Sequence, residues 1–401
     1  MRTRLPRFSP LAAGRWIAPL LLLSLLAHPA APALALDDDH WRDANAAIER
    51  GIEFLRTTQQ DDGSWSADPA GPAVTAMIVA AMLDRPDISA DDPQVSKAID
   101  FILSHVQEDG GIYDGILPNY NTAIALTALS KINHRPDVAQ AIADAQDFLR
   151  GLQWTTGDTD PDGNVVDENH PFYGGFGYGG SGRPDMSNVQ IALEGLIDSG
   201  VDCEDEVIQR AMVFVNRTQG HASNDMFADK IENDGGFIYS TSINKESIGV
   251  PESKASPDMI DEGKAGRPVS GLRTYGSITY AGFKSYLYAE LDRDDPRVLA
   301  ARDWIAHNYT LQQNPGMPEN MKHQGLYYYY HTFARAMDAW GASTITTADG
   351  DSRDWANDLV AQLVELQHED GSWANDADRW MESDANLVTA YALLALTHAI
   401  R

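Results

Sequence analysis

The run from Gly325 to His331 contains four consecutive tyrosines and a histidine, residue types that can take part in proton transfer. On a helix, Tyr327, Tyr330 and His331 would share one face, because residues spaced i, i+3 and i+4 are neighbours. Histidine is the side chain best suited to proton transfer near neutral pH, and tyrosine rings can stack on sugars or stabilise a cation. His331 and Tyr330 are therefore candidate catalytic residues, although a packed tyrosine wall with a hydrogen-bonded histidine would give the same pattern.

Other polar and aromatic residues stand beside Gly-aromatic turns, at the start of small, apolar segments, where we expect them to face a common cavity. A concave site with apolar walls and a few convergent polar groups is the usual form of a binding pocket. Asparagine recurs at three equivalent places, where it could equally cap a helix. Asp185 and Asp384 are further catalytic candidates. The candidate pocket residues are Tyr113, Asp114, Asn121, Tyr178, Asn188, Arg273, Tyr275, Tyr280, Tyr327, Trp380 and Asn386.

An acidic stretch after Gly157 resembles the start of an EF-hand calcium loop, with three carboxylates at alternate positions followed by a glycine. Oxygen ligands at this spacing suit Ca²⁺. Asn169 stands where the bidentate glutamate of such a loop belongs, so an earlier acid would have to substitute. Calcium is therefore a candidate cofactor, and a solvated acidic loop is the alternative. The candidate ligands are Asp158, Asp160, Asp162 and Asp167.

A repeated phrase indicates how these residues are positioned. It runs Gln59-x-x-x-Gly63-x-Trp65 near the start and Gln367-x-x-x-Gly371-x-Trp373 near the end, with weaker copies between. Repeats of this length determine the architecture before any single residue does. The predicted units are 47–83, 95–132, 138–199, 207–291, 298–340 and 355–399.

Each unit pairs two kinds of helix. The first has apolar residues at i, i+3, i+4 and i+7, so one side faces solvent, whereas the second is small and apolar almost all round and is expected to be buried. Six such pairs predict an all-α fold, an (α/α)6 toroid of six inner and six outer helices. Two connectors, at Asp92-Pro93 and Asp295-Pro296, predict an Asp cap followed by Pro at the first helical position. Polar insertions at 157–171, 242–268 and 312–324 are expected to emerge from one or both ends of the ring.

The first 35 residues read as a secretory signal, with four arginines, an apolar run and a cleavage site at Ala33-Leu34-Ala35. Cleavage after Ala35 would leave residues 36–401 as one domain, exported to the periplasm or the medium, with no stable membrane anchor. The net charge of −29 disfavours nucleic acid and anionic lipid headgroups as partners. Cys203 is the only cysteine, so export brings no internal disulfide.

The repeated phrase resembles the QW repeat of squalene–hopene cyclases. Gly235-Gly236-Phe237 resembles the repeat of protein prenyltransferase β subunits. The resemblance covers nearly the whole of residues 36–401 and implies an α/α toroid. It does not carry the catalytic devices of those families. Asp292-x-Asp294-Asp295 matches the cyclase acid motif in letters, but it lies in the repeated capping connector, and Cys203 lacks the Asp-x-Cys spacing of the prenyltransferase zinc site.

Three functions remain open from the sequence. The first is an exported protein of this repeat type whose central cavity binds an apolar or amphipathic, terpenoid-like molecule, with catalysis undecided. The second is a carbohydrate-active enzyme such as a polysaccharide lyase, because some lyases also use α/α barrels, here with His331, neighbouring tyrosines and Arg273. The third is a non-catalytic interaction scaffold. An apolar cavity would favour the first, a polar groove the second and a filled cavity the third.

Overall fold

A computed structural model describes residues 36–132, 135–180, 182–256 and 271–401, which belong to one compact unit. The predicted leader, residues 1–35, and the last part of the predicted insertion 242–268 lie outside the described residues. Within the described ranges the chain is mostly helical, with one two-stranded hairpin, as expected for a fold of the α/α toroid type. No helix in these ranges is both long and apolar enough to cross a membrane.

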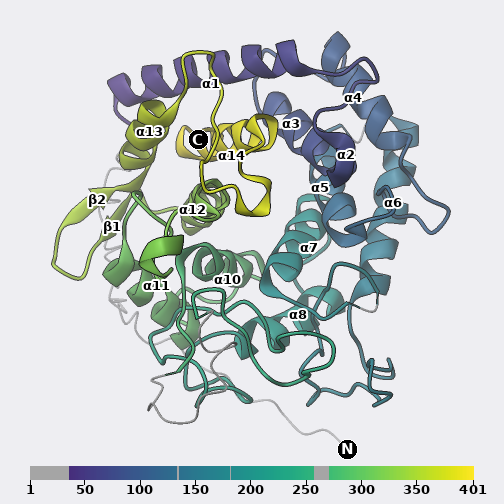
Figure 1. The fold of residues 1–401 in the computed structure, drawn as a ribbon, viewed down its shortest axis with the longest axis vertical. Coiled ribbons are helices and arrows are strands. Elements are labelled where there is room, and N and C mark those ends of the chain that lie inside the picture. Colours follow the sequence, from purple (N-terminus) through teal and green to yellow (C-terminus); the bar gives the residue numbers. More distant parts are fainter. Residues whose placement is uncertain (1–35, 133–134, 181, 257–270) are drawn as a thin grey trace, which may run out of the picture. The chain divides into compact units, whose positions relative to one another are not determined.

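One set of helices lies inside the other in Figure 1. Each inner helix contacts the next one along the chain, and the last contacts the first, which closes the set on itself. These helices are buried nearly all round; in α3, for example, every residue from Ala73 to Met82 is buried. The inner helices are α3 (Ala73–Leu83), α5 (Pro118–Ser130), α7 (Met186–Asp198), α10 (Gly276–Tyr288), α12 (Leu326–Trp340) and α14 (Ala385–Ala399).

The outer helices pack on the inner ones through one apolar stripe each. The predicted Asp-Pro starts are confirmed: the Asp92 carboxylate accepts hydrogen bonds from the first-turn amides of Gln94 and Val95, and Asp295 accepts one from Arg297. The outer helices are α1 (Asp38–Thr58), α4 (Pro93–Leu103), α6 (Pro136–Leu152), α8 (Glu206–Arg217), α11 (Pro296–Asn308) and α13 (Trp355–Leu366).

Short elements complete the described chain. A hairpin that the helical pattern did not predict joins α12 to α13, with Ile345 opposite Arg353 in its antiparallel register. These elements are α2 (Ala67–Ala70), the 3₁₀ turns η1 (Glu319–Met321) and η2 (Arg379–Met381), and the strands β1 (Thr344–Thr346) and β2 (Ser352–Asp354).

The glutamine of the repeated phrase links one unit to the next. The Gln59 side-chain amide donates to the carbonyl of Gly63 at 3.0 Å and to that of Gln94, in the first turn of α4, at 2.9 Å. Gln367 repeats this arrangement, donating to Gly371 in its own unit at 2.8 Å and to Ala47 of α1 at 2.9 Å. The last unit therefore contacts the first through the same bonds that join the first to the second.

The glycine of the phrase allows this close contact. Gly371 has φ of 90°, and a Cβ there would lie 2.4 Å from the carbonyl oxygen of Arg50 on α1. Gly63 has φ of 95° and meets Lys97 of α4 in the same way, at 2.6 Å. Only glycine combines this backbone conformation with so little space.

The two ends of the ring differ in their connections. Every connection from an outer to an inner helix lies where the inner helices begin, and the described parts of all three predicted insertions belong to these connections. The connections from inner to outer helices lie at the opposite end and are short, apart from the hairpin. We call these the insertion end and the short-loop end.

Candidate functional site

The first candidate site is a cavity of about 380 Å³ at the insertion end, which we call the aromatic cavity. Its size falls within the range typical of ligand pockets. First-turn residues of the inner helices form much of its wall, together with short aliphatic side chains. The aromatic residues that line it are Tyr120, Tyr178, Tyr239, Tyr275, Tyr328, Trp380 and Tyr391.

Three of the six tyrosine hydroxyls in this wall are bonded to other groups of the described chain. The hydroxyls of Tyr178 and Tyr239 lie 3.0 Å apart, and Ser187 lies 3.2 Å from that of Tyr239. Gln190 donates to the Tyr328 hydroxyl at 3.0 Å. Burial raises the pKa of Tyr239 well above its ordinary value, so this phenol stays neutral. The rings therefore present a largely apolar surface.

Two of the aromatic side chains mark the mouth of the cavity. Tyr178 is 41% exposed and Trp380 is 45% exposed, whereas Tyr275 is 3% exposed. The ring of Tyr178 stacks on that of Tyr120, with centroids 5.9 Å apart. The partly exposed rings of Tyr178 and Trp380 therefore give the cavity an apolar entrance.

Glu382 is the one Asp, Glu, Lys, Arg or His among the described residues that line the aromatic cavity. Its side chain is buried; one oxygen accepts from the amide of Tyr328 at 2.8 Å and the other from the side chain of Asn375 at 2.6 Å. Burial raises the pKa of Glu382 to about 7, although these hydrogen bonds act in the opposite direction. A carboxyl group with this pKa can donate or accept a proton near neutral pH.

Backbone strain is concentrated around this cavity. Leu117, Trp380 and Met381 all line it and have φ of 48°, 59° and 66°. Left-handed conformations of residues other than glycine cost about 1–3 kcal/mol each and persist only where the surroundings enforce them, often at functional sites. Trp380 and Met381, the two residues just before Glu382, therefore line the cavity in strained backbone conformations.

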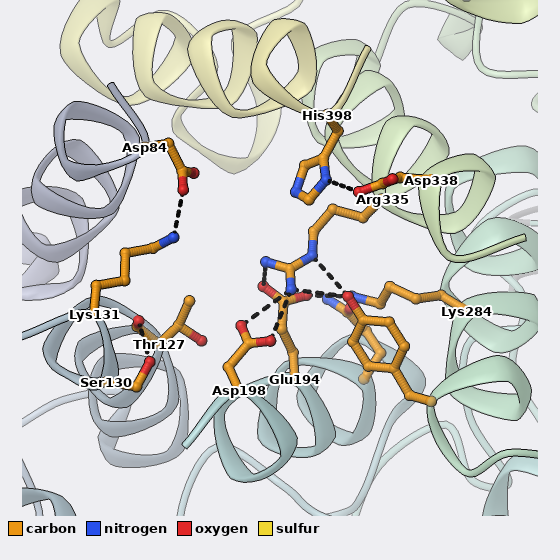
Figure 2. A network of polar contacts seen from close by, with 12 residues as sticks. Asp84, Thr127, Ser130, Lys131, Glu194, Asp198, Lys284, Arg335, Asp338 and His398 are labelled. Carbon is orange, nitrogen blue, oxygen red and sulfur yellow. Dashed lines mark hydrogen bonds and ion pairs between the residues drawn. The ribbon is translucent and has the colours of Figure 1, made fainter. Parts of the chain in front are cut away.

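A second cavity, of about 260 Å³, lies at the short-loop end, and we call it the polar cavity. Met77, Ile124 and Tyr391 line both cavities, so no more than one layer of side chains separates them. Figure 2 shows charged side chains from several inner helices converging there. The polar residues that line it are Asp84, Thr127, Ser130, Lys131, Glu194, Asp198, His331, Arg335, His398 and Arg401.

Ion pairs hold the charges of the polar cavity. Arg335 contacts Glu194 at 2.7 Å and Asp198 at 3.0 Å, and buried Lys284 also pairs with Glu194 (Figure 2). Burial alone would raise the pKa of Glu194, but Arg335 and Lys284 outweigh it and lower that pKa well below its ordinary value. Glu194 is therefore an anion in the interior of the ring.

The predicted catalytic face of α12 is divided in the structure. His331 lines the polar cavity and is 3% exposed, and its Nδ1 atom has no hydrogen-bond partner among the described residues. Burial lowers the pKa of His331 to about 3, so the imidazole is neutral. Tyr330 instead donates its hydroxyl to the carbonyl of Leu311 at 2.6 Å, and Tyr327 packs on Tyr330 with centroids 5.5 Å apart. The three side chains do not form one site.

Several other predicted site residues act at helix starts. Asp185 accepts from the amide of Asn188 at the start of α7, and Asp384 accepts from Asn386 at the start of α14. Buried Asn121 accepts from the amide of Ala73 and so caps the neighbouring helix α3. Of the three recurring asparagines, Asn121 therefore acts as a cap, whereas the amides of Asn188 and Asn386 are themselves capped by the aspartates before them.

The remaining candidates are divided between the aromatic cavity and positions outside both cavities. Of the predicted pocket residues, Tyr178, Tyr275 and Trp380 line the aromatic cavity. The others bond or pack elsewhere: Tyr113 donates to Asp109, and Tyr280 packs on Tyr329 and Phe333. Those lining neither cavity are Tyr113, Asp114, Asn121, Asn188, Arg273, Tyr280, Tyr327 and Asn386.

The acidic loop is held by its own hydrogen bonds. Asp160 is buried and accepts from the amides of Asp162 and Asn164 and from the Asn164 side chain, with His170 at 3.1 Å. Burial alone would raise the pKa of Asp160, but these bonds lower it to about 2. Asp158 and Asp167 likewise accept from nearby backbone amides. Across the described residues no group of three or more His, Cys, Asp or Glu side chains could hold a metal ion, so the geometry gives the calcium hypothesis no support.

A stripe of polar residues in the sequence indicates the polar cavity. Gln190, Glu194 and Asp198 recur at i, i+4 and i+8 along α7, and Glu194 and Asp198 line the polar cavity. Arg335 continues such a stripe on α12 from His331. Glu382 follows the 3₁₀ turn η2, in the irregular connection between α13 and α14, and no periodic pattern in the sequence indicates it.

No protein-family model and no curated protein sequence matches this chain. Its structure is similar to those of solved α/α toroid enzymes. D-mannose isomerase matches with a TM-score of 0.56 at 12% identity, over 89% of this chain and 97% of that one. An α-amylase from Clostridium perfringens gives 0.51 at 12%, over 88% and 97%. The type II terpene cyclase MstE from Scytonema gives 0.50 at 12%, over 90% and 98%. Such similarity shows a shared fold and leaves the activity open, because this fold supports several chemistries.

Proposed function

We propose that this chain is an exported protein whose aromatic cavity binds an apolar or amphipathic, terpenoid-like molecule. The observation that carries the proposal is the wall of the cavity, in which aromatic and aliphatic side chains surround a single carboxyl group, Glu382. The proposal takes the helical ring as an (α/α)6 toroid, which the cyclic contacts of the inner helices support. The proposal infers export from the predicted leader, residues 1–35.

The chemistry of the wall favours an apolar ligand over a glycan at this site. Burying the many hydroxyls of a sugar without hydrogen-bond partners is costly. Here the hydroxyls of Tyr178, Tyr239 and Tyr328 are already bonded to other protein groups, and Glu382 is the one charged residue among the described residues of the wall. The lyase alternative required His331 and Arg273 in one site, whereas His331 lines the polar cavity and Arg273 lines neither cavity. The open volume of about 380 Å³ also argues against a scaffold with a filled centre.

Glu382 gives the proposed site a proton donor. Its carboxyl group is partly protonated near neutral pH, and the surrounding rings could stabilise a positive charge on a bound ligand. The similarity to a terpene cyclase is consistent with such a step but is a likeness of fold. Binding is therefore the proposed function, and proton transfer from Glu382 is its proposed extension.

The test is to titrate purified residues 36–401 with geranylgeraniol by isothermal calorimetry. We expect saturable binding, weakened about tenfold by Trp380→Ala, a loss of about 1.4 kcal/mol, because that side chain borders the ligand space. Trp41→Ala is the matched control, since Trp41 is 50% exposed on α1 and lines neither cavity. Absence of binding, or equal losses in the two variants, would contradict the proposal. Mass spectrometry of molecules extracted from the purified protein provides an independent check, and a co-purifying isoprenoid is the expected finding.

A further inference from the structure

We propose that the polar cavity binds the neutral, hydroxyl-rich head group of an amphiphile whose apolar part occupies the aromatic cavity. The inference rests on the proposed function and specifies the class of ligand. Its starting point is that Met77, Ile124 and Tyr391 belong to the walls of both cavities. A ligand that passed these side chains would meet an apolar wall at one end and a polar wall at the other.

The polar cavity contains a buried group that lacks a partner. His331 lines the cavity, and its side chain is only 3% exposed. Its Nδ1 atom makes no hydrogen bond to the described residues. An unsatisfied buried polar atom costs about 1–3 kcal/mol. A neutral imidazole donates through one nitrogen and accepts through the other. A hydroxyl group, which also donates and accepts, is the ligand group that fits either tautomer.

The ionic groups around the cavity already neutralise one another. Lys131 pairs with Asp84 at 2.6 Å, Arg335 pairs with Glu194 and Asp198, and Arg401 contacts Asp84 at 3.1 Å. A charged head group would have to break one of these pairs or remain uncompensated in a partly buried site, which is costly. A neutral hydroxyl can instead donate to a spare lone pair of a carboxylate, since each carboxylate offers about four acceptor positions.

The rest of the wall suits hydroxyl groups as well. Thr127 and Ser130, in the last turn of α5 just before Lys131, bring side-chain hydroxyls to the lining (Figure 2). The ring of His331 lies 5.6 Å from that of Tyr391, at the boundary between the cavities. Hydroxyl, imidazole and carboxylate groups on an apolar floor form a suitable site for a polyhydroxylated ring.

A chain of hydrogen bonds also connects the two cavities along the ring wall. The Tyr328 hydroxyl, in the aromatic cavity, accepts from Gln190, whose carbonyl accepts from Lys284 at 2.5 Å. Lys284 also bonds to Glu194, which accepts from Arg335 in the polar cavity at 2.7 Å. The two ends are thus positioned by one network, as a single ligand spanning both would require.

The test compares four ligands that share an eight-carbon tail: octyl β-D-glucoside, octyl sulfate, octyltrimethylammonium and octanol. Each is titrated by calorimetry into residues 36–401 below its micelle concentration. We expect the glucoside to bind at least tenfold more tightly than any of the other three. Thr127→Val, which keeps the side-chain shape, and His331→Phe, which keeps an aromatic ring beside Tyr391, should each weaken the glucoside several-fold and leave octanol unchanged. Thr57→Val, at an exposed position on α1, is the control.

The outcomes separate this inference from the proposed function. Equal affinities for the glucoside and octanol, with no effect of Thr127→Val, would overturn the head-group site and leave the apolar cavity in place. Tightest binding of the sulfate or the ammonium compound would overturn it too, in favour of an ion site. If neither octanol nor the glucoside binds, and geranylgeraniol also fails, the proposed function itself is wrong. Because Thr127→Val is a conservative change, the test does not depend on whether His331→Phe folds.

Discussion

At the scale of single residues, Glu382 combines two features that usually oppose each other. Its carboxylate oxygens accept from the start of α12 and from Asn375, which favours the charged form, yet its burial against aromatic rings favours the neutral one. Burial prevails, and the pKa of about 7 makes the protonation of this group sensitive to small changes inside the cavity. A bound apolar ligand would remove water and raise this pKa further.

Glu382→Gln should flatten the dependence of stability on pH. The folded pKa of about 7 lies above the ordinary 4.5, so the stabilisation linked to the protonated carboxyl is fully present below pH 4.5 and is lost as pH rises through 7. The loss amounts to about 3 kcal/mol in the free energy of unfolding. Glutamine stays neutral at every pH, so the difference between wild type and variant should change by this amount across pH 4.5 to 8.

Urea denaturation at several pH values measures this difference. Glu369→Gln, at an exposed acid in the same part of the chain, is the matched control and should follow the wild-type profile. A wild-type profile parallel to that of Glu382→Gln would show that Glu382 ionises normally, and the proton donor assigned to the cavity would be lost.

At the scale of elements, the repeated glutamine is a connection between units that the folded structure explains directly. Gln59 satisfies one carbonyl in its own turn and one in the next outer helix. Gln153 and Gln219 do the same in later units, each bonding to a glycine carbonyl and to the helix that follows. The phrase therefore recurs where a junction leaves these two carbonyls to satisfy, whereas Gln107 in the second unit bonds to His105 and Tyr113 instead.

Gln59→Ala should destabilise the protein by about 1–3 kcal/mol, because the carbonyls of Gly63 and Gln94 would lose a donor in a partly buried place. Gln60→Ala, at the exposed neighbouring position, should change the free energy of unfolding by less than about 0.5 kcal/mol. Urea denaturation of both variants provides the measurement. Similar losses in the two would mean that the side-chain bonds of Gln59 contribute nothing to stability.

The elements themselves could be predicted from the sequence because they depend on local patterns. The apolar segment from Asn386 to Leu396 lies within α14, and the Asp-Pro connectors start α4 and α11. The site could be predicted only in part. A helix that is buried all round has no solvent-exposed side to fix its rotation about its own axis, so the side chains that face the ring interior depend on the neighbouring helices. Thus His331 faces the ring interior, whereas Tyr330, one position away, reaches Leu311.

At the scale of the whole molecule, the ring is closed by the contact between the last and the first unit. Gly371 meets Arg50 of α1, and Gln367 bonds to Ala47, so both parts of the repeated phrase take part in closure. The cavities depend on this closure, since α14 and α3 lie on either side of it and both contribute to the walls. A substitution at the contact between the last and the first unit should therefore change the shape of the two cavities, although the substituted residue lines neither of them.

Gly371→Ala should cost clearly more than Gly350→Ala. Both glycines have φ near 90°, so alanine at either site carries the left-handed strain of about 1–2 kcal/mol. Only at Gly371 would the new Cβ also lie 2.4 Å from a backbone oxygen of α1, whereas Gly350 has open space around it. Thermal and urea denaturation compare the two, and the excess for Gly371→Ala measures the closing contact. Equal losses of stability in the two variants would mean that the contact of Gly371 with α1 does not contribute to closing the ring.

The fold alone does not identify the activity at this scale. An isomerase and an amylase match the chain as well as a terpene cyclase does, all at 12% identity. The interior of this chain is divided into an aromatic part where the inner helices begin and a charge-paired part where they end. The functional proposals above rest on that division.

The closing contact also bears on how the chain acquires its structure. Gln367 and Ala47 are separated by 320 positions, so the bond that joins the last unit to the first has nearly the largest sequence separation available to the described chain. Contacts of such separation slow folding, because loop-closure entropy must be overcome before they form. During synthesis α1 emerges first, yet α13 and α14, on which it packs, emerge last. Until then α1 can contact earlier segments such as Trp65, but it lacks the partner surface that α13 and α14 supply, and the ring cannot close.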